Sequence, residues 1–325
     1  CRAGGANRWH YLFDSNRGDN KALYSNDTYT EDSQTPTYNT QSFQPNGTRI
    51  VRTNGDHLNN NGDTYVSWNW KANAEVTVSH SAGDNSATEA SVSQANTDAG
   101  FSIVTYTGDT TGHGSTYPST FNHGLGLRPK MIIVKARNSA QSWAVYRDDM
   151  NGTSSYNHAM FLDLNNAKSS ATNAYWGGNA MTLNTNLFSV GSHSTTGANG
   201  VNYVAYCFAE VEGYSKFGTY IGNNVGGDGT FVYLGFRPAW IMIKRDEAGV
   251  GWFMYDTKRS PYNLAYQTLF ANGADVEGTY TGDSIDILSN GFKIRANVNR
   301  TGLTTVDTYF YMAFAEQPFK YANAR

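Results

Sequence analysis

Internal repetition constrains this chain more than any other feature, because a repeat fixes the number and kind of modules before any strand is assigned. Three segments align without gaps, at residues 64–72, 202–210 and 308–316. Large residues recur in them at every second position, which is the period of a β-strand. Both faces of the aligned segments are fairly apolar, so we expect central strands rather than edge strands.

A tryptophan precedes each aligned segment at a similar distance. The intervals from Trp9, Trp143 and Trp252 to the first tyrosine of the following segment are 56, 60 and 57 residues (9 to 65, 143 to 203 and 252 to 309). Recurrence at this spacing predicts that all three tryptophans belong to hydrophobic cores. An aspartate follows each one, at positions 14, 148 and 256, and we expect these carboxylates to cap turns or strand ends.

Two of the three copies share a front half. Arg128-Pro129 and Arg237-Pro238 each begin an apolar run, and proline fits the start of a strand, where its missing N–H does no harm. We expect both arginines to pair with a carboxylate or to cap a strand end. The first copy lacks this half, since residue 1 falls where its strand should end. We therefore expect the polypeptide to extend upstream or to be cut inside this module, whose edge needs a cover.

Composition points to strands joined by polar turns. Charged residues make up 16% and aromatic residues 14%, while helix-forming runs are almost absent. We predict an all-β protein of tandem β-sandwich or jelly-roll-like modules, one partial and two complete. The expected domains are a partial first β module at 1–72, a polar linker with short strands at 73–98, a second module at 99–213 and a third at 214–325.

Charge and hydropathy narrow the expected partners. The net charge of −3 gives no reason to expect binding to nucleic acid, and no apolar run approaches 18 residues, so we expect no membrane insertion. Cys1 and Cys207 do not imply a disulfide framework, and Cys207 is expected to be a buried thiol.

No catalytic constellation stands out in the sequence. His113 and His123 are ten residues apart, each followed by glycine, and we interpret them as turn residues rather than metal ligands. Nucleophile-elbow, phosphate-loop and dinucleotide fingerprints are missing. We expect no enzymatic activity, no cofactor and no metal.

One pair of aromatic residues is a candidate ligand site. Tyr175 and Trp176 precede two glycines in a segment that only the second copy contains. An exposed tryptophan there would stack on the C–H face of a sugar ring. The alternative, which we favour because tryptophan is usually largely buried, is that Trp176 closes the end of a β-sandwich.

Several phrases of the sequence resemble a known group of proteins. They lie at residues 99–108, 123–126, 205–218 and 311–325. Together they are similar to uncharacterised repeat proteins encoded by marine bacteriophages, including phages of cyanobacteria. The resemblance covers essentially the whole chain and implies a virion or tail-associated protein, some relatives being described as lectin-like. It carries over no catalytic or binding residue.

These observations lead to three functional hypotheses. The first is a non-enzymatic virion structural protein, a tail fibre, tail-associated or capsid-surface component that forms a homo-oligomer, contacts other virion proteins and contributes to host attachment. The alternative is a carbohydrate-binding adhesin that recognises host surface glycans, which stacking aromatics exposed on one shared face would favour. A glycan depolymerase, the weakest, needs two carboxylates about 5–10 Å apart in a groove.

Overall fold

The fold consists of antiparallel β-strands. The computed structural model describes residues 2–3, 9–33, 39–52, 58–72, 76–109, 118–148, 158–170, 174–247, 249–279, 281–295 and 306–316, and among them no α-helix occurs. Two compact units result, each described by itself. Unit 1 comprises Cys1–Asp163 and Ser169–Ala209, and unit 2 comprises Leu164–Lys168 and Glu210–Arg325.

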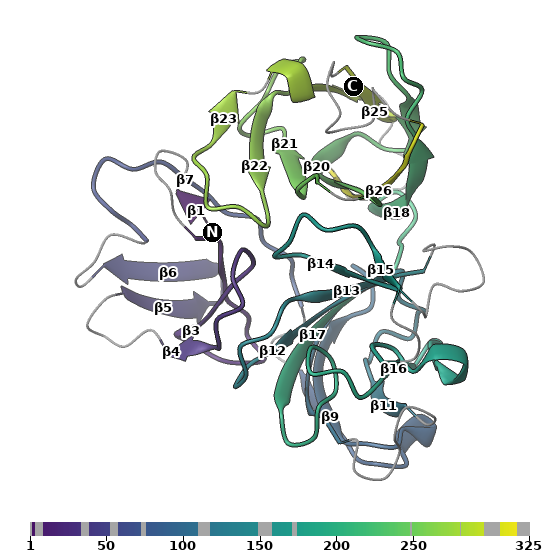
Figure 1. Cartoon of the computed structure of the whole chain (residues 1–325). Helices are drawn as coiled ribbons and strands as arrows, with labels where there is room; N and C mark the ends of the chain where they lie inside the picture. The colour runs from purple at the N-terminus through teal and green to yellow at the C-terminus, as the bar shows by residue number, and fades with distance from the viewer. Residues whose placement is uncertain are drawn as a thin grey trace. The chain divides into compact units, whose positions relative to one another are not determined.

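The largest sheet belongs to unit 1 and has eight strands (Figure 1). Its middle strands are apolar on both faces and almost wholly buried, which is why they occupy the centre and not an edge. In order across the sheet, the strands are β15 (Ser169–Ser170), β14 (His158–Phe161), β13 (Ala144–Arg147), β12 (Met131–Ala136), β17 (Asn202–Phe208), β10 (Phe101–Thr107), β9 (Ser91–Asn96) and β8 (Thr77–His80).

Smaller sheets complete unit 1. A two-stranded sheet pairs β11 with β16, a three-stranded sheet has the order β2-β3-β4, and two further pairs join β5 to β6 and β1 to β7. Short 3-10 turns occur at Asp84–Ser86 and Gly178–Ala180. The strands are β1 (Arg2–Ala3), β2 (Tyr11–Leu12), β3 (Lys21–Tyr24), β4 (Asp32–Ser33), β5 (Asn39–Gln44), β6 (Gly47–Arg52), β7 (Tyr65–Val66), β11 (Ser119–Asn122) and β16 (Leu187–Val190).

Unit 2 contains a six-stranded and a three-stranded sheet. Apolar side chains from both sheets form one buried cluster, so the two sheets share a core. A 3-10 turn spans Thr281–Asp283. The larger sheet has the order β18 (Ser215–Ile221), β26 (Thr308–Ala315), β20 (Pro238–Arg245), β21 (Phe253–Asp256), β22 (Gln267–Phe270) and β23 (Gly278–Thr279); the smaller has β19 (Phe231–Tyr233), β25 (Gly291–Ile294) and β24 (Ile285–Leu288).

The two large sheets correspond strand for strand. The order β18-β26-β20-β21-β22-β23 in unit 2 matches β10-β17-β12-β13-β14-β15 in unit 1. The register also matches, since Lys135 pairs with Val204 and Lys244 pairs with Phe310 in the corresponding ladders. Corresponding positions of the two sheets can therefore be compared residue by residue.

The aligned segments lie where the repeat analysis expects them, with one correction. Residues 202–208 and 308–315 form the central strands β17 and β26, and the two Arg-Pro runs lead into β12 and β20. Within residues 64–72, only Tyr65 and Val66 form a strand, the short β7, which pairs with β1. The stretch 73–98 supplies β8 and β9 to the large sheet.

A recurrent backbone contact corrects the alignment of the tryptophans. At the start of three strands, a backbone N–H donates to an Asn or Asp side chain 16 to 20 residues later. Trp9 does not make this contact, because it precedes the corresponding position by one residue and is only half-buried. The three donors and acceptors are His10 to Asn26 (2.9 Å), Trp143 to Asp163 (2.8 Å) and Trp252 to Asn272 (2.8 Å).

Each large sheet buries a lysine at the corresponding position. Lys135 has no exposed surface, and its Nζ donates to the carbonyls of Thr28 and Ala136, both at 3.1 Å. Burial lowers the pKa of Lys135 to about 8, because the interior disfavours the charged form. Lys244 is equally buried and donates to the Arg245 carbonyl at 2.6 Å. Backbone carbonyls thus satisfy both ammonium groups.

A buried ion network stabilises the turn after β2. Arg17 pairs with Asp14 and, at 3.0 Å, with Glu31, and its NH2 group donates to the Leu12 carbonyl at 3.1 Å. Burial raises the pKa of Glu31, but hydrogen bonds and charge from Arg137 and Arg17 outweigh it and lower the pKa overall. Unit 2 repeats the arrangement with Arg259, Asp256 and Glu277.

We predict that removal of the buried guanidinium destabilises the protein far more than removal of an exposed one. Arg17→Met leaves a buried carboxylate without its main partner and should lower the free energy of unfolding by about 3–5 kcal/mol. The matched control is Arg237→Met, whose partner Glu316 is 44% exposed, with an expected loss under about 1 kcal/mol. Urea denaturation followed by tryptophan fluorescence measures both. Equal losses would contradict the prediction.

Candidate ligand-binding site

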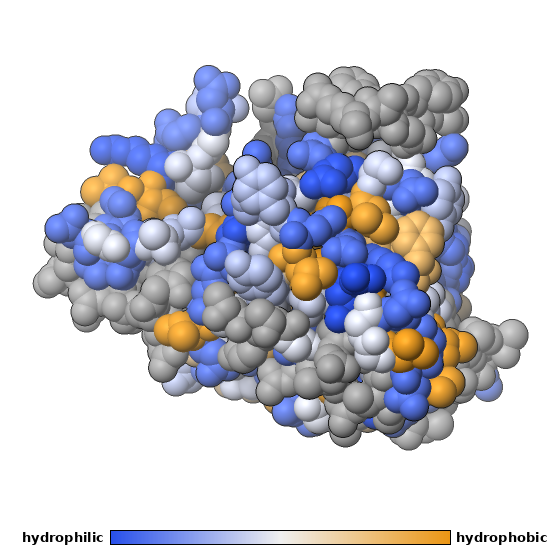
Figure 2. All heavy atoms as spheres, turned by 90° about the horizontal axis from the view of Figure 1, so that it is seen from above, coloured by the Kyte–Doolittle hydropathy of each residue, from blue (hydrophilic) through white to orange (hydrophobic). Residues whose placement is uncertain are grey.

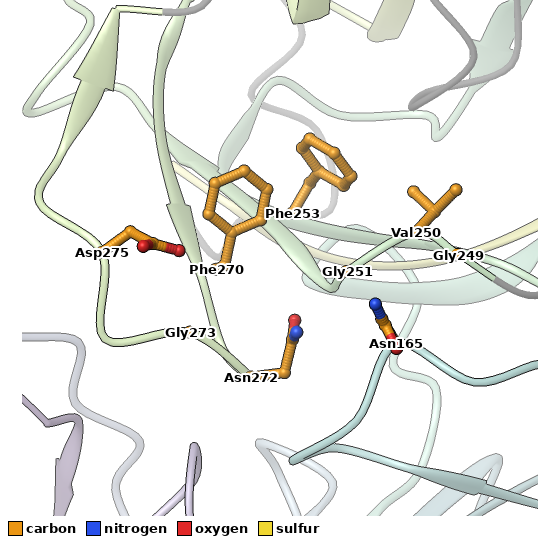
Figure 3. Close-up of a pocket in the computed structure, with 9 residues that line it drawn as sticks. All are labelled: Asn165, Gly249, Val250, Gly251, Phe253, Phe270, Asn272, Gly273 and Asp275. Carbon is orange, nitrogen blue, oxygen red and sulfur yellow. The ribbon is translucent and has the colours of Figure 1, made fainter.

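A pocket of about 290 Å³ lies in unit 2, at the ends of β21 and β22 (Figure 3). The loop before β21 contributes Gly251, and β21 itself contributes Phe253. Phe270 ends β22, and Asn272 and Asp275 follow it. The last wall comes from the segment 164–168, which supplies Asn165. The volume is near the lower end of small-molecule sites, about 300–1,000 Å³.

Backbone contacts fix the shape of this pocket. The Asn272 Oδ1 atom accepts the Trp252 N–H at 2.8 Å, and the Asn165 carbonyl accepts the Gly249 N–H at 3.0 Å. A Cβ atom on Gly251 would lie 2.7 Å from the Asn272 Oδ1 atom, so only glycine fits there without a shift. The pocket is therefore preformed, because contacts within unit 2 hold its walls in place.

The lining combines amides, one carboxylate and an aromatic ring. Asn165 and Asp275 are exposed, and Asn272 and Phe270 are half-buried. Phe270 packs edge-on against the buried Phe253, with ring centroids 4.8 Å apart. In Figure 3 the Asn272 amide points toward Gly251 and Phe270, and the Asp275 carboxylate points inward. No cationic side chain lines this pocket, so its charge is neutral to negative.

The structure does not present Tyr175 and Trp176 as a stacking platform. Trp176 has no exposed surface, its Nε1 donates to the His158 carbonyl at 2.9 Å, and its ring meets Tyr146 edge-on. Tyr175 is 6% exposed and packs on His193 at 4.3 Å. The glycan-stacking hypothesis for this pair is corrected by their burial: the rings fill the interior, because the indole N–H finds a backbone partner there.

Two other aromatic rings do share an exposed face. Phe231 and Tyr233 on β19 are 43% and 60% exposed, while Val232 between them is buried. The alternation places both rings on one side of the strand, from residues about 7 Å apart along the backbone. Tyr233 pairs with Gly291, so no side chain lies directly across from its ring, and the Lys216 ammonium lies 5.4 Å from the ring centre.

Apolar groups on the face drawn in Figure 2 are small and interspersed with hydrophilic residues. Scattered apolar residues of this kind are normal on protein surfaces.

The predicted structural roles are confirmed for Arg128, Arg237, Asp14 and Asp256 but not for Asp148. Arg128 pairs with Asp148 at 2.5 Å, and Arg237 pairs with Glu316 at 2.8 Å. Asp14 accepts the Arg17 N–H at 2.8 Å, and Asp256 likewise accepts the N–H groups of the turn that follows it. Asp148 differs from Asp256, because in the strand register Arg147 occupies the position of unit 1 that corresponds to Asp256.

The histidines differ in how much the structure says of them. His113 lies outside the described residues. His123 is fully buried; its Nε2 lies 3.2 Å from the Asn184 carbonyl, and its Nδ1 accepts the Leu125 N–H. Among the described residues, no group of three His, Cys, Asp or Glu side chains has the arrangement of a metal site. The same residues include no helix long and apolar enough to span a membrane.

Sequence reasoning missed the pocket residues. The strongest available signal is a difference between the copies: where unit 2 has Gly251 and Asn272, the corresponding residues of unit 1 are Ser142 and Asp163. The sequence does not predict the contribution of Asn165. Its segment, 164–168, lies within the expected second module but belongs to unit 2 in the structure.

Comparison with known proteins gives a family without a described activity. The family model described as Domain of unknown function (DUF7483) matches residues 1–318, so the chain belongs to this family. No curated protein and no solved structure matches the chain.

We predict an acid-labile fold because of His123. Burial lowers the pKa of His123 from 6.5 to about 4, so below pH 6.5 the unfolded chain binds a proton that the folded chain does not. Stability should be complete above pH 6.5 and should fall by up to about 3 kcal/mol as the pH drops to 4.

Urea denaturation at several pH values tests this assignment against a His123→Gln variant. The variant is expected to lose stability at every pH but to show a shallower slope between pH 6.5 and 4. An unchanged slope would assign the acid sensitivity to other groups.

Proposed function

We propose that this member of the DUF7483 family is a non-enzymatic structural protein of a bacteriophage particle. In this proposal it is a tail-fibre, tail-associated or capsid-surface component that forms a homo-oligomer, contacts other virion proteins and contributes to host attachment. Its architecture is a tandem array of β-sandwich-like modules, one partial and two complete.

The observation that carries the proposal is the correspondence between the two large sheets. Six strands follow the same order in each unit, and the buried lysines and the N–H to Asn or Asp contacts recur at corresponding positions. A chain that repeats one module presents the same kind of surface more than once. Such repetition supports a structural role, and the resemblance to phage repeat proteins indicates which kind of particle.

Purified phage particles test this proposal. We expect mass spectrometry of particles separated on a density gradient to detect this chain in many copies, and cross-linking to join it to itself and to other virion proteins. The control is the same preparation from a phage whose gene for this protein carries an early stop codon. A chain that is abundant in lysate but missing from particles would refute the proposal.

The alternative function, a carbohydrate-binding adhesin, is favoured by the exposed pair on β19. Phe231 and Tyr233 present two aromatic rings to solvent on one face, the arrangement that stacking on successive sugar rings requires. Polar groups lie next to them: Lys293 pairs with Phe231 in the ladder and forms an ion pair with Asp228. The two functions overlap if the particle protein also binds the host surface.

We predict that removing both rings weakens binding to host surface polysaccharide. The double variant Phe231→Ala/Tyr233→Ala should bind at least about tenfold more weakly, because each stacked ring contributes roughly 0.5–1.5 kcal/mol. The matched control is Tyr262→Ala, since Tyr262 is 83% exposed elsewhere in unit 2. Glycan arrays with biolayer interferometry measure both. An equal effect of the two substitutions would contradict a role for the β19 face.

A further inference from the structure

We infer that the pocket of unit 2 binds a single neutral pyranose ring. This inference rests on the carbohydrate-binding form of the proposed function and assigns that function a second, smaller site. The pocket is separate from the β19 face, since its walls come from β21, β22 and residues 164–168.

Size and charge narrow the ligand class first. A volume of about 290 Å³ suits a small ligand and not an oligosaccharide or peptide. Asp275 is the lone ionisable side chain in the lining, and no lysine, arginine or histidine faces the ligand. Anionic ligands such as phosphate, sulfate or uronic acids would meet a carboxylate and no cation, so the lining disfavours them, whereas a neutral ligand meets no charge repulsion.

The hydrogen-bonding groups match hydroxyls. An amide offers both donors and an acceptor, and a carboxylate offers acceptors, so Asn165 and Asp275 together can pair with several hydroxyl groups. The Asn272 Oδ1 atom accepts the Trp252 N–H, so the Nδ2 group of the same amide is the donor that can bond to a ligand hydroxyl. Phe270 supplies a half-buried ring for the apolar C–H face of the sugar.

The pocket depends on residues that differ between the two sheets. In unit 1 the residue corresponding to Gly251 is Ser142, whose side chain lies beside the Asp163 carboxylate. In unit 2, Gly251 and Asn272 border the pocket. Gly251 is therefore the residue that creates the space, since any Cβ atom there would contact Asn272.

The comparison with unit 1 suggests a double variant of unit 2. Both of its new residues already occur at the corresponding positions of unit 1. Gly251→Ser/Asn272→Asp copies Ser142 and Asp163 into unit 2, preserves the acceptor for the Trp252 N–H and places a hydroxymethyl group and a second carboxylate at the pocket wall. Asn165→Ala is a second variant that does not threaten folding, because Asn165 is exposed and its structural contact is through its backbone carbonyl. Asn179→Ala, an exposed amide in unit 1, is the matched control.

The experiment is saturation-transfer NMR and titration of the full chain. The probes are glucose, galactose, mannose, fucose and N-acetylglucosamine, with glucuronic acid and glycerol as charged and acyclic comparisons. We expect at least one neutral pyranose to bind the wild-type chain, and the two comparisons to bind at least about tenfold more weakly. Asn165→Ala should weaken binding about threefold to tenfold, as expected for one lost hydrogen bond. Gly251→Ser/Asn272→Asp should abolish binding, and Asn179→Ala should leave it unchanged.

Three outcomes would overturn the inference. One is that no neutral pyranose binds the wild-type chain; another is that glucuronic acid binds as well as the neutral sugars. The third is that a sugar binds but Asn165→Ala and the folded double variant bind it unchanged. If no free sugar binds but polysaccharide binding is present and is lost in Phe231→Ala/Tyr233→Ala, the pocket inference fails and the carbohydrate-binding function stands. If the wild-type chain binds neither polysaccharide nor free sugar, both fail.

Discussion

The pairing of one central strand with two neighbours organises each unit. β17 pairs with β10 along seven residues and with β12 along six, and β26 pairs with β18 and β20 in the same way. Because a register shift of one residue would turn every side chain to the opposite face, these ladders fix which residues are buried. The positions of β13, β14, β21 and β22, and hence of the pocket, follow from the central pairing.

Polar groups inside the sheets depend on that register. Lys135 and Lys244 remain buried because carbonyls lie within reach of each ammonium group, and Arg17 because two carboxylates and two carbonyls surround it. The same requirement explains why Asn or Asp recurs beside the N–H groups at the start of three strands: a buried donor needs an acceptor. The pocket is the place where such an acceptor, Asn272, also lies next to an opening, because its neighbour is glycine.

The sequence predicted features that follow from local periodicity and repetition. The all-β class, the central strands β17 and β26, and the strands after the two Arg-Pro pairs follow from alternation and proline chemistry. The length of β7 and the burial of Trp176 did not follow, since both depend on which partner a segment finds in space. The spacing of Trp9 does not reveal that His10, one residue later, occupies the position of Trp143 and Trp252. The pocket was missed because Asn165 is far from Asn272 in sequence, and only the fold brings them together.

The burial of Cys207 has a consequence for how the central strand can be observed. This thiol lies in β17 with no exposed surface, and burial raises its pKa to about 12. Since the thiolate is the reactive form, Cys207 is inert toward alkylating reagents while the ladder is closed. Its rate of modification then reports how often β17 separates from β10 and β12, so the chain contains its own probe of the opening of this central ladder.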